Sequence, residues 1–129
     1  MLLPTTLCLA AALALVNIWL AGRIGRVRRL NSIWMGDGGN DLLGRRMRAQ
    51  LNFAENVPVV LVLVALIEFT GKGDLWLSIV AAVFTLGRML HAIGMDGQLM
   101  WGRMAGAGTT FITQIGLAVV AVLLAAQVI

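Results

Sequence analysis

The sequence predicts an all-α fold, a bundle of four transmembrane helices, and three observations support this prediction. Of the 129 residues, 60% are hydrophobic and only 12% are charged. A soluble domain of this size cannot bury so much apolar surface. The apolar residues fall into four runs, each long enough to cross a hydrocarbon core of about 30 Å. The charged residues gather between these runs, so the excess apolar surface is expected to face lipid in a single domain over residues 1–129.

Short polar breaks separate the four predicted helices. The first run has no basic residue before it and is about 20 residues long, which is typical of a spanning helix rather than of a secretory signal. Asp74 is a plausible N-cap for the third helix, and glycines between positions 94 and 97 end it. We expect one long linker, roughly residues 22–44. The predicted helices cover about residues 2–21, 44–70, 74–95 and 103–128.

The distribution of Lys and Arg predicts the orientation. The second connection holds only Lys72. The first and third connections, with the adjoining helix ends, hold Arg23, Arg26, Arg28, Arg29, Arg45, Arg46, Arg48, Arg88 and Arg103. Because positive residues stay on the cytoplasmic side, we expect the first and third loops in the cytoplasm and both termini outside it.

The net charge of +4 does not indicate nucleic acid as a partner. The basic residues lie beside apolar runs, where they act as topology signals. One histidine, one cysteine and scattered carboxylates supply no recognisable set of metal ligands. Cys8 cannot form an intramolecular disulfide and is expected to be a packing residue.

Polar residues within the spans are the candidates for function, because a charge at the centre of a membrane helix costs about 2.5–3.5 kcal/mol. Arg48, Asn52 and Glu55 share one face of the second helix, and Arg88 and His91 share one face of the third. A rise of about 1.5 Å per residue places Glu55, Arg88 and His91 roughly 18–22 Å below the outer helix ends. These side chains should therefore meet at one level, in a polar funnel that opens to the cytoplasm.

Two interpretations of this funnel stay open. Glu55 could pair with Arg88 or Arg48 in a network that only holds helices together. Alternatively, the surplus of guanidinium groups could bind an anionic ligand. Gly102 and Gly106 permit close approach of helices, and Thr110 and Gln114 are expected to hydrogen-bond across helices.

Residues 45–58, which read RRMRAQLNFAENVP, resemble the second-helix signature of the MAPEG family, the membrane-associated proteins in eicosanoid and glutathione metabolism. Residues 36–40 (GDGGN) and 87–94 (GRMLHAIG) resemble its bacterial members. The resemblance implies a homotrimer in the bacterial inner membrane, with glutathione as co-substrate bound near the cytoplasmic face between protomers. It also implies a glutathione transferase or peroxidase that acts on a lipophilic electrophile or a lipid hydroperoxide.

The resemblance also assigns roles residue by residue. Arg48, Asn52 and Glu55 match positions that hold glutathione, with Glu55 placed for its ammonium group, and Gln50 matches a further contributing position. Arg88 and His91 match positions that line the site. Arg103 matches the arginine that stabilises the glutathione thiolate, and the alternative is that it only sets membrane topology.

The chain departs from the family in one respect, because it contains no tyrosine. Asn56 and Met95 stand where relatives carry tyrosines that contact the ligand. Whether the protein is an enzyme therefore stays open, with a glutathione transferase favoured. The alternatives are a non-catalytic protein of the same fold that binds lipid and, less favoured, a small proton-coupled exporter that uses Glu55.

Overall fold

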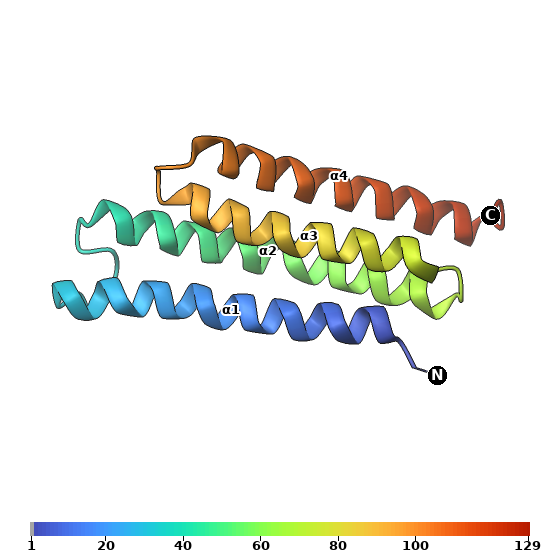
Figure 1. The fold of residues 1–129 in the computed structure, drawn as a ribbon, viewed down its shortest axis with the longest axis horizontal. Helices are drawn as coiled ribbons and strands as arrows, with labels where there is room; N and C mark the ends of the chain where they lie inside the picture. Colours follow the sequence, from blue (N-terminus) through green and yellow to red (C-terminus); the bar gives the residue numbers. More distant parts are fainter. Residues whose placement is uncertain (1) are drawn as a thin grey trace.

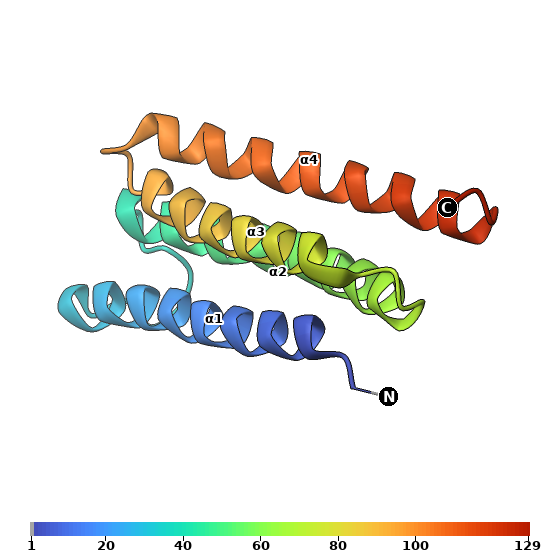
Figure 2. The same ribbon diagram turned by 45° about the vertical axis from the view of Figure 1, so that its right-hand side comes forward.

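A computed structural model describes residues 2–129 as four helices that run up and down side by side (Figures 1 and 2). Each helix is long and apolar enough to cross a membrane. The first and third loops lie at one end of the bundle, and the second loop and both termini lie at the other (Figure 1). The all-α, four-span prediction is confirmed. The helices are α1 (Pro4–Asn31), α2 (Asp41–Phe69), α3 (Asp74–Met95) and α4 (Met100–Ala125).

Helix α1 is longer than predicted. It ends at Asn31, where Ser32 adopts a left-handed conformation with φ of 53°, instead of ending near residue 21. Arginine is a good helix former, so the basic string marks a membrane boundary without stopping the helix. The predicted linker of residues 22–44 was therefore wrong at both ends. Helix α2 already begins at Asp41, capped by the Asn40 side chain, which accepts from the Leu43 amide at 2.9 Å.

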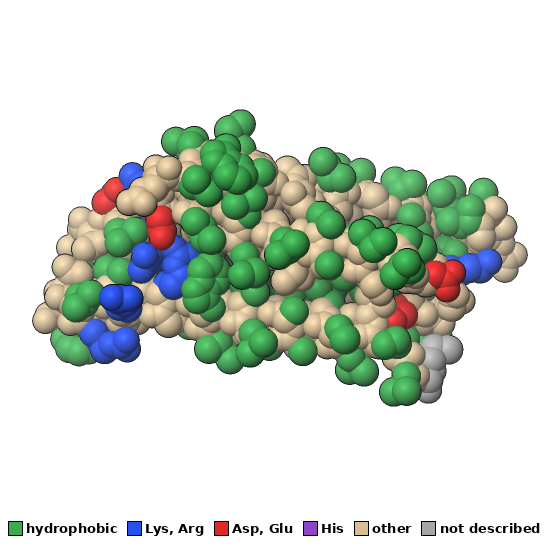
Figure 3. Space-filling model, in the orientation of Figure 1, with side chains coloured by type: hydrophobic (Ala, Val, Ile, Leu, Met, Phe, Trp, Pro, Cys, Tyr) green, Lys and Arg blue, Asp and Glu red, His purple; other side chains and the backbone are tan. Residues whose placement is uncertain are grey.

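The core runs along the middle of the bundle, where α2 contacts all three other helices. Phe53 and Val60 of α2 pack there with Leu77 and Phe84 of α3. Large apolar side chains also cover the outside of the bundle, and the basic side chains gather at the end that holds the first and third loops (Figure 3). This pattern places the apolar middle in lipid and the basic end at a membrane surface.

Helices α3 and α4 approach each other through glycines. A Cβ atom on Gly106 would collide with the Cβ of His91 and would lie 2.6 Å from the Gly87 carbonyl oxygen. One on Gly102 would lie 3.1 Å from the Leu90 carbonyl oxygen. The expected close approach at Gly102 and Gly106 is confirmed.

A cluster of charges joins three parts of the chain at the basic end. Asp96, in the turn after α3, accepts from Arg46 of α2 at 3.2 Å and pairs also with Arg23 of α1. Arg46 further donates to the Arg23 carbonyl oxygen at 3.1 Å, and the Arg23 guanidinium lies 4.8 Å from the centre of the Trp19 ring. The sequence pattern did not predict this cluster.

Candidate functional site

Four of the five polar residues expected to meet line a cavity of about 450 Å³ between α2, α3 and the start of α4. This volume lies within the ~300–1,000 Å³ typical of small-molecule sites. Because their spacing keeps them on one face of each helix, the side chains point into a common space. The lining residues are Arg48, Leu51, Asn52, Glu55, His91, Met95 and Arg103.

The cavity carries two arginines and one carboxylate, and the carboxylate has no ion-pair partner among residues 2–129. The ion pairs within residues 2–129 join Asp96 to Arg23 and Arg46, and Asp41 to Arg45. Glu55 takes part in none of them. The structural alternative, in which Glu55 pairs with Arg88 or Arg48, is therefore not what the structure shows. Arg48, Glu55 and Arg103 are all exposed in the single chain, so the cavity is open to a ligand.

Arg88 does not line the cavity but lies behind its wall. Arg88 is only 2% exposed to solvent. The guanidinium donates to the Thr110 hydroxyl at 2.6 Å and to the Asn52 side-chain oxygen at 2.6 Å, and lies 3.2 Å from Nδ1 of His91. Arg88 thus holds two lining residues in place and ties α3 to α2 and α4.

Gln50, the remaining predicted site residue, lies outside the lining of this cavity. It is half-buried, and two helical steps of about 100° turn it away from Arg48. The structure of one chain therefore does not bring Gln50 together with the other candidates.

Asn56, which stands where relatives carry a tyrosine, serves helix packing. Its side-chain nitrogen donates to the Asn52 carbonyl oxygen at 2.8 Å, and its side-chain oxygen accepts from Gln114 at 2.9 Å. The bonds of Gln114 to Asn56 and of Arg88 to Thr110 confirm the expected cross-helix hydrogen bonds of α4.

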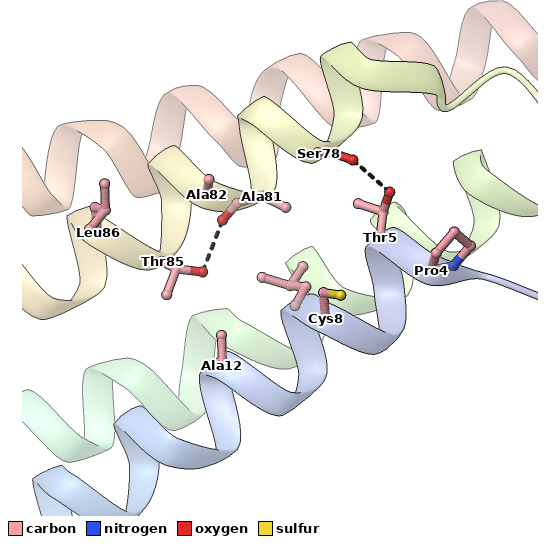
Figure 4. Close-up of a pocket in the computed structure, with 10 residues that line it drawn as sticks. Pro4, Thr5, Cys8, Ala12, Ser78, Ala81, Ala82, Thr85 and Leu86 are labelled. Carbon is pink, nitrogen blue, oxygen red and sulfur yellow. Dashed lines mark hydrogen bonds between the residues drawn. The ribbon is translucent and has the colours of Figure 1, made fainter.

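A second cavity, of about 580 Å³, lies between α1 and α3 toward the end of the bundle that holds the termini (Figure 4). Its walls are small side chains such as Ala12 and Ala82, and a 2.8 Å hydrogen bond joins the Thr5 and Ser78 hydroxyls at one side. Cys8, expected to be a packing residue, is exposed and lines this groove. The groove shares no lining residue with the polar cavity.

These features define an integral membrane protein of four helices with an arginine-rich cavity near one membrane surface. The chain belongs to the MAPEG family, whose model matches residues 6–123. The resemblance seen in the second-helix segment is therefore confirmed over most of the chain.

The chain is also similar to two curated bacterial proteins, each called Inner membrane protein YecN. They come from Escherichia coli strain K12 and from E. coli O6:H1 strain CFT073, and each is 29% identical over 86 residues. The match covers 67% of this chain and 66% of the length of each relative. No solved structure matches the chain significantly. The relatives' name supports the inner membrane as the location.

Proposed function

We propose that the protein is a glutathione-dependent transferase or peroxidase that acts on lipophilic substrates in the membrane. The observation that carries this proposal is the cavity that combines Arg48 and Arg103 with the unpaired Glu55. Glutathione has two carboxylates, one ammonium group and one thiol, which is the charge pattern that such a lining complements. Arginine suits carboxylates because its fork of donors matches their geometry.

Each end of glutathione has a suitable partner in the cavity. Glu55 would accept from the ammonium group, and Arg48 and Asn52 would donate to a carboxylate. Arg103 would face the thiol. In the homotrimer that the family implies, a neighbouring protomer would cover the exposed side of these residues.

Arg103 would raise the reactive fraction of the thiol. A free cysteine thiol has a pKa of about 8.5, so little of it is ionised at neutral pH. A guanidinium close to the sulfur stabilises the thiolate, which is the nucleophile. With no tyrosine in the chain to donate a hydroxyl, this charge is the main stabiliser that the lining offers.

The thiolate then reacts with a substrate that enters from the bilayer. In the transferase reaction a carbon–sulfur bond forms, and the leaving group departs with its electron pair. In the peroxidase reaction the thiolate attacks the outer oxygen of a lipid hydroperoxide, the O–O bond breaks and the alkoxide takes a proton. The resulting sulfenic acid condenses with a second glutathione to give glutathione disulfide and water.

Glutathione binding in detergent, measured by calorimetry and by thermal shift, tests the proposal. Glu55→Gln removes the charge opposite the ammonium group, and a charge-assisted hydrogen bond contributes about 1.5–3 kcal/mol, so Kd should rise roughly 10–100-fold. Asp74→Asn is the matched control, because it removes one negative charge at the other end of the bundle. Equal binding by wild type and Glu55→Gln would contradict the assigned role of Glu55.

The ultraviolet absorbance of bound thiolate tests Arg103 directly. Wild type with glutathione at neutral pH should show it, Arg103→Ala should lose it, and Arg103→Lys should retain part of it because the positive charge remains. An unchanged spectrum in Arg103→Ala would leave Arg103 with only its topological role.

A second candidate, lipid binding without catalysis, is favoured by the apolar groove between α1 and α3 and by the missing tyrosines. A purified protein that retains lipid but gains no stability from glutathione would decide for it.

A further inference from the structure

The hydrogen bonds of Arg88 determine where the protons of its neighbours lie. A guanidinium has only donors and stays protonated in proteins. Each atom that it contacts must therefore be an acceptor. The contacts are the Thr110 hydroxyl oxygen, the Asn52 side-chain oxygen and Nδ1 of His91.

Thr110 agrees with this assignment. Its hydroxyl donates to the Gly106 carbonyl oxygen at 2.9 Å, which leaves a lone pair for Arg88. The Thr110 hydroxyl can therefore accept from Arg88 while it donates to Gly106.

Two lining residues acquire a fixed polarity from the same contacts. Asn52 turns its oxygen toward Arg88, so its NH2 group is the part left for the cavity. His91 accepts at Nδ1, so a neutral ring carries its proton on Nε2, and His91 also lines the cavity. If the Asn52 amide were flipped, or if His91 carried its proton on Nδ1, an N–H donor would face the donors of the buried Arg88 guanidinium.

We propose that Arg88 is a positioning residue that turns the wall formed by Asn52 and His91 into a surface of hydrogen-bond donors. Glu55 is then the one charged acceptor of the lining, so the cavity selects a ligand with one cationic group and several acceptor oxygens. The choice of glutathione as that ligand rests on the proposed function. The orientation of the Asn52 amide and the position of the proton on His91 follow from the contacts of Arg88 alone.

The chain has a single histidine, so the pattern can be read without any ligand. Protein labelled with ¹⁵N-histidine, in detergent micelles, should give one imidazole with Nε2 protonated and Nδ1 unprotonated. Arg88→Met should change the Nδ1 signal or mix the tautomers, because the donor is lost. A wild-type ring protonated on Nδ1, or the same spectrum in a folded Arg88→Met, would overturn the inference. If Arg88→Met does not fold, the wild-type tautomer decides alone.

Asn52→Asp provides the second arm. The carboxylate keeps an acceptor for Arg88 but replaces the NH2 donor of the cavity with an oxygen. We expect a folded protein with an unchanged His91 tautomer and at least tenfold weaker glutathione binding. If Asn52→Asp bound glutathione as tightly as wild type, the proposal that Asn52 presents a hydrogen-bond donor to the cavity would be wrong. Wild type that shows the expected tautomer yet binds no glutathione would refute the proposed function and leave the role of Arg88 standing.

Discussion

Glu68 lies in α2 but completes the first turn of α1. Pro4 has no amide hydrogen, and the Leu7 amide already bonds to the Leu3 carbonyl oxygen. The amides of Thr5 and Thr6 remain, and the Glu68 carboxylate accepts from both at 2.8 Å. Helix starts leave such donors unpaired, and in a membrane they are expensive. A side chain more than 60 residues away in sequence thus supplies the missing cap.

Glu68→Ala should lower the free energy of unfolding by about 0.5–2 kcal/mol, the usual cost of losing a helix cap. Glu68→Gln, which keeps one acceptor oxygen, should fall between wild type and Glu68→Ala. Thermal unfolding in detergent measures the effect, and Lys72→Ala, at an exposed position near the same membrane surface, is the control. A Glu68→Ala variant as stable as this control would show that the cap contributes nothing.

The contrast between Glu55 and Arg88 shows how far residue patterns predict a site. The spacing of polar residues predicted that Glu55 and Arg88 lie on the faces of their helices that point toward each other. In the structure α2 and α3 do pack together. Spacing cannot tell how a long side chain bends, and Arg88 turns behind Asn52 to reach Thr110 of α4. The roles of Glu68 and Asp96 depend on partners 50 or more residues away, for which the sequence gives no local signal.

At the scale of elements, the glycines of α3 and α4 set the distance between two helices. Gly106 faces the backbone of α3. An added Cβ on Gly108, two residues on, would meet no atom of residues 2–129 within 4 Å apart from its chain neighbours and the nearby backbone of its own helix. The two positions share one helix and the same change in helix propensity, so they separate the effect of packing from that of propensity.

Gly106→Ala should therefore destabilise the protein, because over-packing costs about 1–3 kcal/mol. Gly108→Ala should be neutral or should gain up to about 1 kcal/mol from helix propensity. Unfolding midpoints in detergent compare the two variants. Similar midpoints would show that α3 and α4 can move apart at no cost.

The charge cluster around Asp96 joins α1 and α2 to the turn after α3. Asp96→Asn leaves Arg23 and Arg46 without their carboxylate, and we expect a loss of about 1–3 kcal/mol. Asp41→Asn removes the same charge from the exposed pair with Arg45, which should cost less than about 1 kcal/mol. Denaturation of both variants side by side is the measurement, and equal losses would mean that the cluster is no stronger than a surface pair.

Helix ends were the least predictable part of the elements. Hydropathy identified all four spans because lipid requires a long apolar run. It did not locate the end of α1 at Asn31, because four arginines follow the apolar run and arginine is a good helix former. The loop that results is short, because α2 already begins at Asp41.

For the whole molecule, the distribution of basic residues predicts one orientation in the membrane. The loops with most of the arginines should lie in the cytoplasm and the loop with Lys72 outside it. Since Cys8 is the only cysteine, a Cys8→Ala background allows single cysteines to report each side.

In that background, Lys72→Cys should react with an impermeant maleimide added to spheroplasts with the outer membrane removed. Trp34→Cys, in the first loop, should react only after the membrane is permeabilised. Both positions are exposed in the single chain, so access to the reagent should depend on the side of the membrane. The opposite pattern would reverse the orientation and place the polar cavity on the outer side.

The position of Asp96 in the chain has a consequence for assembly during translation. Arg46 precedes it by 50 residues, so a ribosome that has finished the first helical hairpin has made both arginines and not yet their carboxylate. The hairpin can insert, but Arg23 and Arg46 gain their shared carboxylate only once the third segment has entered the bilayer and the turn after it has emerged. Insertion of that segment therefore joins α1 and α2 to the turn after α3, before α4 packs against α3.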